Sequence, residues 1–392
     1  MKITKVDIFQ LSTDIRPGWR PVVCRVYTDE GFYGDGEAAL AYDEGSLAAF
    51  GMIKDLAEMI IGMNPLDTEV IWDYLYRNTF WGQNGGPVIF AGISALDIAL
   101  WDIKGKYFNV PLYQLLGGKK RDNLRCYASQ LQFGWGNERI PARTPEEYAN
   151  NARLAINEGY DAVKIDFFTF DEKGGCYGDN DRLGLLGKKN LHMYEKRLKA
   201  VREEIGPDVD IIIENHSSTD AQSAIQLARI AEKYDIFAFE EPTTPYPKIT
   251  EYISKRINIP IASGERIYTR WQYAEYFERN ALQLIQPDIG NCGGLTETKK
   301  VCDMAYAYDV GVQCHVCASP LSTAVALHLE AVIPNFVIHE HHTYNRHQYN
   351  KEYCIYDYQP ENGRFKVPER PGIGNEFSLD ALSQAIEKIT VE

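Results

Sequence analysis

The chain has 392 residues, 45% of them hydrophobic, and a formal net charge of −14 at pH 7. This length suits one large barrel with a smaller domain, or two medium domains. The acidic balance and the absence of a basic tract exclude a typical nucleic-acid-binding protein. No apolar run approaches the roughly 20 residues of a membrane span, and the N-terminus lacks signal-peptide features, so we expect a cytoplasmic protein.

The eight cysteines are scattered along the chain and do not frame a small domain. This distribution favours reduced thiols over disulfides. Cys314 and Cys317 form a close pair, but no second pair or suitable histidine spacing accompanies them. We therefore interpret them as buried thiols and not as a zinc or redox site.

The N-terminal segment predicts strands at 3–11 and 21–28, joined by a turn at Pro17 and Gly18. A second hairpin signal at 28–31 leads into the sequence FYGDGEA. Alternating apolar residues bounded by turn residues are typical of antiparallel strands.

Three helical patterns follow, near 44–61, 67–77 and 88–106. The third predicts a helix with one buried face. Its apolar residues are Ile93, Leu96, Leu100, Ile103 and Tyr107.

From about residue 124 the chain alternates between short apolar runs and helical patterns. The eight runs begin near Leu124, Asp161, Val209, Ile236, Ile259, Leu282, Gly311 and Phe336. Eight such units favour a (β/α)-barrel over a doubly wound sheet. The stretch 360–392 carries a strand and a helix pattern, and we expect it to return to the N-terminal domain.

We therefore predict an N-terminal α+β domain at 1–123, a barrel at 124–358 and a returning C-terminal segment at 359–392. Two long loops, 167–190 and 341–350, follow the second and eighth barrel strands and would lie at the catalytic end, over a substrate. For the first loop, a surface insertion is the alternative interpretation.

Three glutamates each end an apolar run at near-equal intervals: Glu214 in IIIENH, Glu240 in IFAFEEP and Glu265 in IPIASGER. The intervals are 26 and 25 residues, about one strand, one helix and two loops. Parallel barrel strands would bring all three carboxylates to the end of the barrel that holds active sites. Such oxygen ligands predict a Mg²⁺ site.

Asp288 and His315 lie 27 residues apart, at the ends of the predicted sixth and seventh barrel strands. An aspartate that accepts from one imidazole nitrogen fixes the tautomer and raises the basicity of the other nitrogen. His315 alone could be a core histidine. With Asp288 and three upstream carboxylates, the pattern favours a catalytic base.

A series of short segments occurs in this order along the chain: SALDIALWDIKGK, PLYQLLGG, VKID, IIIENH, FEEP, SGE, QPDIGNCGG, QCH and IHE. Together they resemble the mandelate racemase subgroup of the enolase superfamily. The resemblance covers nearly the whole chain and implies a modified TIM barrel with an α+β capping domain. It implies that Glu214, Glu240 and Glu265 bind Mg²⁺, and Glu241 is the less suitable member of its pair. Aspartate is more usual at position 214.

The resemblance also assigns His315 and Asp288 as the base dyad, and Glu340 as a group that supports the substrate carboxylate. His216 is similar to the histidine of galactonate and related sugar-acid dehydratases that protonates a departing 3-hydroxyl. The alternative for His216 is a loop histidine near a metal.

Lys164 and Asp166 depart from the Lys-x-Lys pattern that is common in the subgroup. A racemase needs bases on both faces of the substrate, so the aspartate disfavours racemisation. Lys164 is a candidate partner of the substrate carboxylate. Asp166 is a candidate to bind a sugar hydroxyl or to pair with Lys164.

Specificity is expected to come from loops, and the candidate residues are Trp19, Arg20, Trp81 and Arg143. For Trp81 a core position, and for Arg143 a plain surface position, are the alternatives. Four histidines gather near the eighth strand: His339, His341, His342 and His347. We favour a polar loop over a second metal site there.

The combined pattern predicts a Mg²⁺-dependent hydro-lyase that converts an acid sugar to a 2-keto-3-deoxy acid. An aldonate such as galactonate or gluconate is the preferred substrate, and an aldarate such as galactarate is the alternative. Epimerisation, lactone cycloisomerisation or a non-catalytic role are the other hypotheses. We expect a homo-oligomer that binds neither nucleic acid nor membrane.

Overall fold

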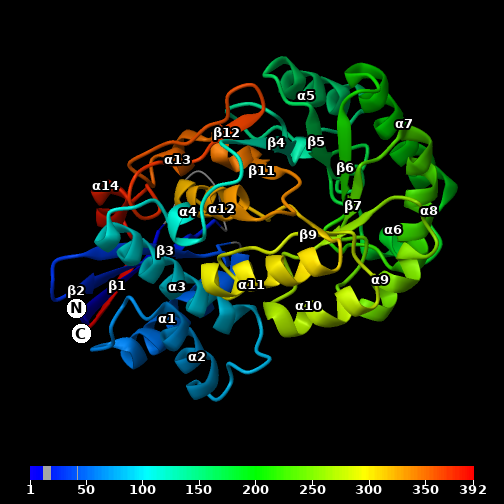
Figure 1. Ribbon diagram of the computed structural model, residues 1–392. Coiled ribbons are helices and arrows are strands. Elements are labelled where there is room, and N and C mark those ends of the chain that lie inside the picture. Colours follow the sequence, from blue (N-terminus) through cyan, green and yellow to red (C-terminus); the bar gives the residue numbers. More distant parts are fainter. Residues whose placement is uncertain (12–18, 42) are drawn as a thin grey trace.

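The computed structural model describes residues 1–11, 19–41 and 43–392, and the predicted turn at Pro17 and Gly18 lies outside them. A curled parallel sheet forms one domain and a smaller antiparallel sheet with helices forms the other (Figure 1). The predicted barrel with an α+β capping domain is therefore confirmed. In the described part of the chain, no helix is both long and apolar enough to cross a membrane.

The capping domain contains a four-stranded antiparallel sheet in the order β13-β1-β2-β3. These strands are β1 (Ile3–Gln10), β2 (Val22–Thr28), β3 (Tyr33–Ala38) and β13 (Glu387–Val391). The helices are α1 (Ser46–Ile60), α2 (Thr68–Asn78), α3 (Pro87–Phe108) and the short α4 (Leu112–Leu115). The predicted strands and helices of this segment are confirmed within a few residues.

Helix α3 differs from the prediction of a single buried face, because almost its whole circumference is buried. It packs on β3, where a side chain at Gly34 or Gly36 would collide with the α3 backbone at Ala99 or Ala95. Tyr107, expected in the buried stripe, is 42% exposed. The stripe of large apolar residues underestimates the buried surface of α3, because small residues on its other faces are buried as well.

The C-terminal segment returns to the capping domain as predicted, because β13 pairs with β1 along five residues (Figure 1). Asp35 on β3 strengthens this return. It accepts two hydrogen bonds from Arg25, at 2.7 and 2.8 Å, and one from the backbone N–H of Phe377 at 2.9 Å. The short β12 (Arg364–Lys366) instead pairs with barrel strand β4. The division at residues 123 and 358 stays a prediction.

Within the described residues, eight parallel strands follow one another around the barrel. They are β4 (Asn123–Ser129), β5 (Ala162–Ile165), β6 (Asp210–Glu214), β7 (Ala238–Glu240), β8 (Ile261–Ser263), β9 (Leu284–Ile285), β10 (Gly311–Val312) and β11 (His339–His342). A parallel bridge from Val312 to Phe336 joins the two ends of the sheet. All eight predicted strands are confirmed.

Further helices follow along the rest of the chain. They are α5 (Pro145–Asn157), α6 (Asp179–Arg182), α7 (Lys188–Ile205), α8 (Ala221–Ala231), α9 (Pro247–Ser254), α10 (Thr269–Glu278), α11 (Gly294–Ala307), α12 (Pro320–Val332), α13 (Gln348–Lys351) and α14 (Leu379–Ser383). The longer ones surround the strands (Figure 1). Their apolar faces pack against the outer face of the sheet in one large core.

The barrel interior is filled in layers, because inward-facing residues recur every second position along a strand. A lower apolar layer contains Tyr127, Ala162, Ile212, Ala238, Ala262, Leu284 and Ile338. Two residues further along the same strands the sequence places Ser129, Lys164, Glu214, Glu240, Gly264, Gln286 and Glu340. The strand period therefore stacks a polar, charged layer directly above an apolar floor.

Replacing Asp35 by alanine should lower the free energy of unfolding by about 3–5 kcal/mol, because it leaves the buried Arg25 charge without its partner. Chemical denaturation would measure the loss. The control is Asp73→Ala, which breaks an exposed pair with Arg77 and should change stability by less than about 0.5 kcal/mol. Equal stability of the two variants would contradict the importance of Asp35.

Candidate active site

A buried ammonium group organises the charged layer of the barrel. The Nζ atom of Lys164 lies 2.7 Å from Glu240, 2.9 Å from Glu340 and 3.0 Å from Glu214. All four side chains are buried. An ammonium group has three N–H donors, so these three carboxylates use its donor capacity in full.

The charges in this layer do not balance, since one lysine faces three carboxylates. Burial lowers the pKa of Lys164, but the carboxylates outweigh burial and hold this pKa well above its usual value. Burial, with Glu214 beside it, raises the pKa of Glu240 well above the usual range. One oxygen of Glu240, Oε2, is buried and makes no hydrogen bond. The layer therefore has an excess of carboxylates over cationic groups and a carboxylate oxygen without a hydrogen bond, and both features suit a bound cation.

The third predicted metal ligand, Glu265, points to different partners in this structure. Its carboxylate contacts the guanidinium of Arg266, which also contacts Glu241, and lies 3.4 Å from Nε2 of His315. Within residues 1–11, 19–41 and 43–392, no three His, Cys, Asp or Glu side chains already form a metal-ligand cluster. The donors fit Mg²⁺ in kind and in charge, since it prefers carboxylate oxygens.

His315 and Asp288 form the predicted dyad. The Nδ1 atom of His315 lies 2.7 Å from Oδ2 of Asp288, whose other oxygen accepts from the backbone N–H of Gly290 at 2.7 Å. Burial lowers the pKa of His315, but Glu265 and Asp288 outweigh burial and raise the pKa to about 10. The contact with Asp288 leaves Nε2 as the nitrogen available for chemistry.

A second imidazole–carboxylate pair joins His216 to Asp166. Nδ1 of His216 lies 3.0 Å from Oδ2 of Asp166, whose other oxygen accepts from the N–H of Phe168 at 2.7 Å. The chain turns sharply after β6, with φ of 45° at His216 and 55° at Ser217, a region that few side chains adopt. Burial lowers the pKa of His216, but Glu214 and Asp166 raise it to about 10.

Two glutamines that the sequence analysis did not single out connect this second pair to strand β4. The N–H of Asp166 donates to Oε1 of Gln132 at 3.1 Å, and the Gln132 amide donates to the oxygen of Gln130. Because a backbone N–H can only donate, this chain turns the amide nitrogen of Gln130 toward Nε2 of His216, at 3.2 Å. The same amide nitrogen also donates to Glu214 at 3.4 Å, and its place beside Nε2 fits the ring after that nitrogen has given up its proton.

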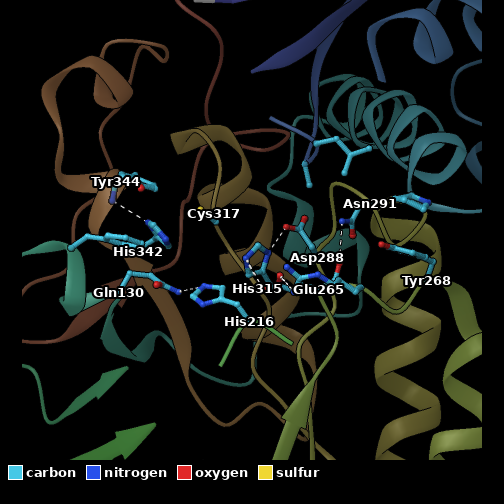
Figure 2. Close-up of a pocket in the computed structure, with 15 residues that line it drawn as sticks. Gln130, His216, Glu265, Tyr268, Asp288, Asn291, His315, Cys317, His342 and Tyr344 are labelled. Carbon is cyan, nitrogen blue, oxygen red and sulfur yellow. Dashed lines mark hydrogen bonds and ion pairs between the residues drawn. The ribbon is translucent and has the colours of Figure 1, made fainter. Parts of the chain in front are cut away.

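Both histidines line one cavity of about 500 Å³ at the carboxyl ends of the strands. Figure 2 shows His315 with Asp288 and Glu265, and His216 with Gln130. The lining residues are Ala39, Leu40, Pro87, Gln130, Phe133, His216, Glu265, Arg266, Tyr268, Asp288, Asn291, His315, Cys317, His342 and Tyr344. Ala39, Leu40 and Pro87 come from the capping domain, so both domains build the cavity.

The predicted partners of the substrate carboxylate and hydroxyls occupy other places. Lys164 and Asp166 lie beneath the cavity and are not among its lining residues. Asp166 pairs with His216, and Lys164 pairs with the glutamates and not with Asp166. Their roles as substrate contacts stay predictions, and in the structure both side chains bind the charged groups next to them.

The four predicted specificity residues are also absent from the cavity lining. Arg20 and Arg143 are exposed elsewhere, and Trp81 is 73% exposed with its ring against Phe80. Trp19 is buried and packs on Tyr344, which does line the cavity. Their roles in substrate specificity stay predictions, because the direction of a loop depends on contacts far along the chain.

The histidines of strand β11 divide between its two faces, as strand alternation requires. His339 pairs with Glu330 of α12 at 2.6 Å, and His341 contacts the hydroxyl of Tyr160 at 2.5 Å, both outside the barrel. His342 lines the cavity. The interpretation as a polar loop, and not as a second metal site, agrees with this division.

The two long loops at the catalytic end differ in whether they contribute residues to the cavity. The predicted loop 341–350 contains the end of β11 and the helix α13, and it contributes His342 and Tyr344 to the cavity. The loop 167–190 carries α6 and contributes no residue to the lining. A catalytic-end position alone was too weak a signal to identify substrate contacts.

Comparisons with known proteins agree with this architecture. The family model "Mandelate racemase / muconate lactonizing enzyme, N-terminal domain" matches residues 4–117, and "Enolase C-terminal domain-like" matches residues 147–381. A D-galactonate dehydratase of Cronobacter sakazakii is 30% identical over 97% of this chain and 94% of its own length. A D-xylonate dehydratase of Haloferax volcanii is 33% identical over 97% and 89%.

A crystal structure of an enolase superfamily member from Salmonella Typhimurium superposes with a TM-score of 0.97. It is 50% identical and covers 100% of both chains. Two family models together span most of the sequence in the order of the two domains. The chain therefore belongs to the mandelate racemase / muconate lactonizing enzyme family of the enolase superfamily.

Proposed function

We propose that this protein is a Mg²⁺-dependent dehydratase of an acid sugar, which forms a 2-keto-3-deoxy acid. The observation that carries the proposal is a pair of imidazole–carboxylate couples, His315–Asp288 and His216–Asp166, whose rings face one cavity. Elimination of water needs one group to take a proton and another to give one. The two dehydratase relatives act on sugar acids by their names.

In this mechanism Nε2 of His315 takes the proton from C2 of the substrate. Asp288 holds the ring through Nδ1 and stabilises the imidazolium that forms. Mg²⁺ bound by Glu214, Glu240 and Glu265 would stabilise negative charge on the substrate carboxylate and offset the Glu265 charge that favours a protonated His315.

His216 is the proposed acid on the other side of the reaction. A proton from Nε2 joins the departing C3 hydroxyl, the C3–O bond breaks and water leaves. The electrons of the broken C2–H bond form the C2–C3 double bond of an enol, which tautomerises to the ketone. The substrate hydroxyl would take the place of the Gln130 amide beside Nε2.

Lys164 and Glu340 act beneath the substrate. Glu340 accepts from Ser129 at 2.6 Å and from the N–H of Val316 at 2.9 Å, next to His315 in sequence. Lys164 lies within 3.0 Å of Glu340 and of two proposed metal ligands, Glu214 and Glu240, and its charge favours their ionised forms. Both residues therefore support the charged groups that meet the substrate.

The preferred substrate class is a monoacid, an aldonate such as galactonate, xylonate or gluconate. A diacid such as galactarate would need a second cation for its distal carboxylate. Arg266, already paired with two glutamates, is the one Lys or Arg among the described lining residues. Lys188 and Lys189 of the loop 167–190, which could otherwise serve a second carboxylate, lie at the start of α7 and are not among the lining residues.

Epimerisation at C2 is the second candidate, and the Gln130 geometry favours it. An amide nitrogen facing Nε2 suits the deprotonated form of His216, which is the minor form at neutral pH because its pKa is about 10, and which would act as a base. His216 could then exchange a proton with the face opposite His315.

A screen of aldonic and aldaric acids with Mg²⁺ in deuterated water separates these functions. Formation of a 2-keto-3-deoxy acid, detected as its semicarbazone, supports the dehydratase. Deuterium at C2 with inverted configuration and no ketoacid supports the epimerase. If Mg²⁺ binds but no acid gives either the ketoacid or deuterium at C2, the result contradicts both the dehydratase and the epimerase.

Asp288→Asn should lower kcat by about 10²–10⁴, because the amide no longer supports the protonated ring of His315. The slow step should become proton removal, so a C2-deuterated substrate should react more slowly still. The control is Asp303→Asn, an exposed aspartate paired with Lys299, which should keep full activity. Unchanged kcat in Asp288→Asn would reject the dyad.

His216→Asn should separate the two halves of the reaction. Loss of ketoacid formation with retained exchange of the C2 hydrogen is expected, since His315 is untouched. Asp166→Asn should act in the same direction with a smaller loss. If His216→Asn stops exchange and elimination equally, His216 is not the specific acid.

Chelation with EDTA should abolish activity, and added Mg²⁺ should restore it and raise the melting temperature by binding the native state. Glu265→Gln should remove most of this thermal shift, while Glu58→Gln, an exposed change on α1, should not. An unchanged shift in Glu265→Gln would exclude this carboxylate as a ligand.

A further inference from the structure

The two helices that follow the dyad strands begin against the capping domain. Helix α11 follows the loop that carries Asp288, and α12 follows the loop that carries His315 (Figure 1). The first backbone N–H groups of any helix lack partners within the helix. Here the capping domain supplies buried acceptors to both helices.

Helix α11 receives its acceptors from α3. The Ser94 hydroxyl accepts from the N–H groups of Gly293 and Gly294, at 3.0 and 2.8 Å. Asp97 accepts from the N–H and the hydroxyl of Thr296, at 2.9 and 2.6 Å. The N-cap residue of α11 is Gly293, which has no side chain to cap the helix. Ser94 and Asp97 of the capping domain therefore supply side-chain acceptors that this helix end lacks.

Helix α12 receives a carboxylate from β3. Glu37, fully buried, accepts from the N–H of Ser319 at 3.1 Å, from its hydroxyl and from the hydroxyl of Ser322 at 2.8 Å. Ser319 already caps the helix through the N–H of Leu321. Burial raises the pKa of Glu37 to about 7. Because Ser319 already caps the N-terminus of α12, the buried Glu37 carboxylate is not needed for that capping bond.

Both contacts are close to the dyad along the chain. The N–H of Cys292 donates to the carbonyl of Asp288 at 2.8 Å, one residue before Gly293. Ser319 is four residues after His315, in a segment without regular structure. A third contact, from the N–H of Ala39 to the carbonyl of Gly290 at 3.0 Å, joins β3's end to the same loop.

We propose that Glu37 and Asp97 of the capping domain are positioning residues for the His315–Asp288 pair. Each fixes the first turn of the helix behind one member of the pair, so the capping domain sets the geometry between imidazole and carboxylate. A shift of the catalytic groups by about 1 Å can cost a hundredfold in rate. The expected kinetic effect rests on the proposed function, but the geometric effect does not.

The test compares Glu37→Gln and Asp97→Asn with a change at the opposite end of α12. Arg121 donates to the carbonyls of Glu330 and Ile333 there, at 2.6 and 2.8 Å, so Arg121→Ala is the matched control. The first readout is the NMR signal of the Nδ1 proton that His315 shares with Asp288, in the full chain with Mg²⁺. His315→Asn identifies this signal.

The Nδ1 signal should shift or broaden in Glu37→Gln and Asp97→Asn and stay in place in Arg121→Ala. On the substrate found by screening, kcat should fall about tenfold or more while KM changes by less than about threefold. An unchanged signal in both variants, or an equal shift in Arg121→Ala, overturns the proposal whatever the substrate is. If Glu37→Gln does not fold, Ser322→Ala removes one of its hydrogen bonds and should shift the signal in the same direction.

Discussion

The buried ammonium of Lys164 is the interaction on which the rest of the site depends. Its charge favours the ionised forms of Glu214, Glu240 and Glu340, which all lie within 3.0 Å of its Nζ atom. Without this charge the three buried carboxylates would have no cationic partner in the layer. The single positive charge leaves an excess of negative charge, and this excess is what makes the layer suitable for a divalent cation. The lysine thus sets the charge of this layer without lining the cavity.

Strand periodicity explains why much of this site could be predicted from sequence. An inward-facing residue at the end of a parallel strand is fixed by counting in steps of two, so Glu214, Glu240 and Glu340 followed directly from the strands. The 27-residue interval between Asp288 and His315 held for the same reason. The eight strands and the three N-terminal helices were predictable because their hydrophobic patterns are local.

The missed contacts are those that local patterns do not determine. Trp81 and Arg143 lie on loops whose direction depends on packing, and neither reaches the cavity. Asp166 lies directly after β5, but its pairing with His216 depends on a left-handed turn after β6 that no pattern in IIIENH signals. Gln130 was missed because a single glutamine after a strand carries no recognisable motif.

The two histidine pairs are built alike but supported differently, and this difference bears on their chemistry. His315 is held by Asp288, by a contact with Glu265 and by helices that begin on the capping domain. His216 is held by Asp166 and by Gln130 and Gln132, which follow β4, so all three supports belong to the barrel domain. A movement of the capping domain would therefore disturb proton removal at His315 while leaving His216 in place. In the proposed mechanism, proton removal at C2 is therefore the step that depends on the contacts between the capping domain and the two helices.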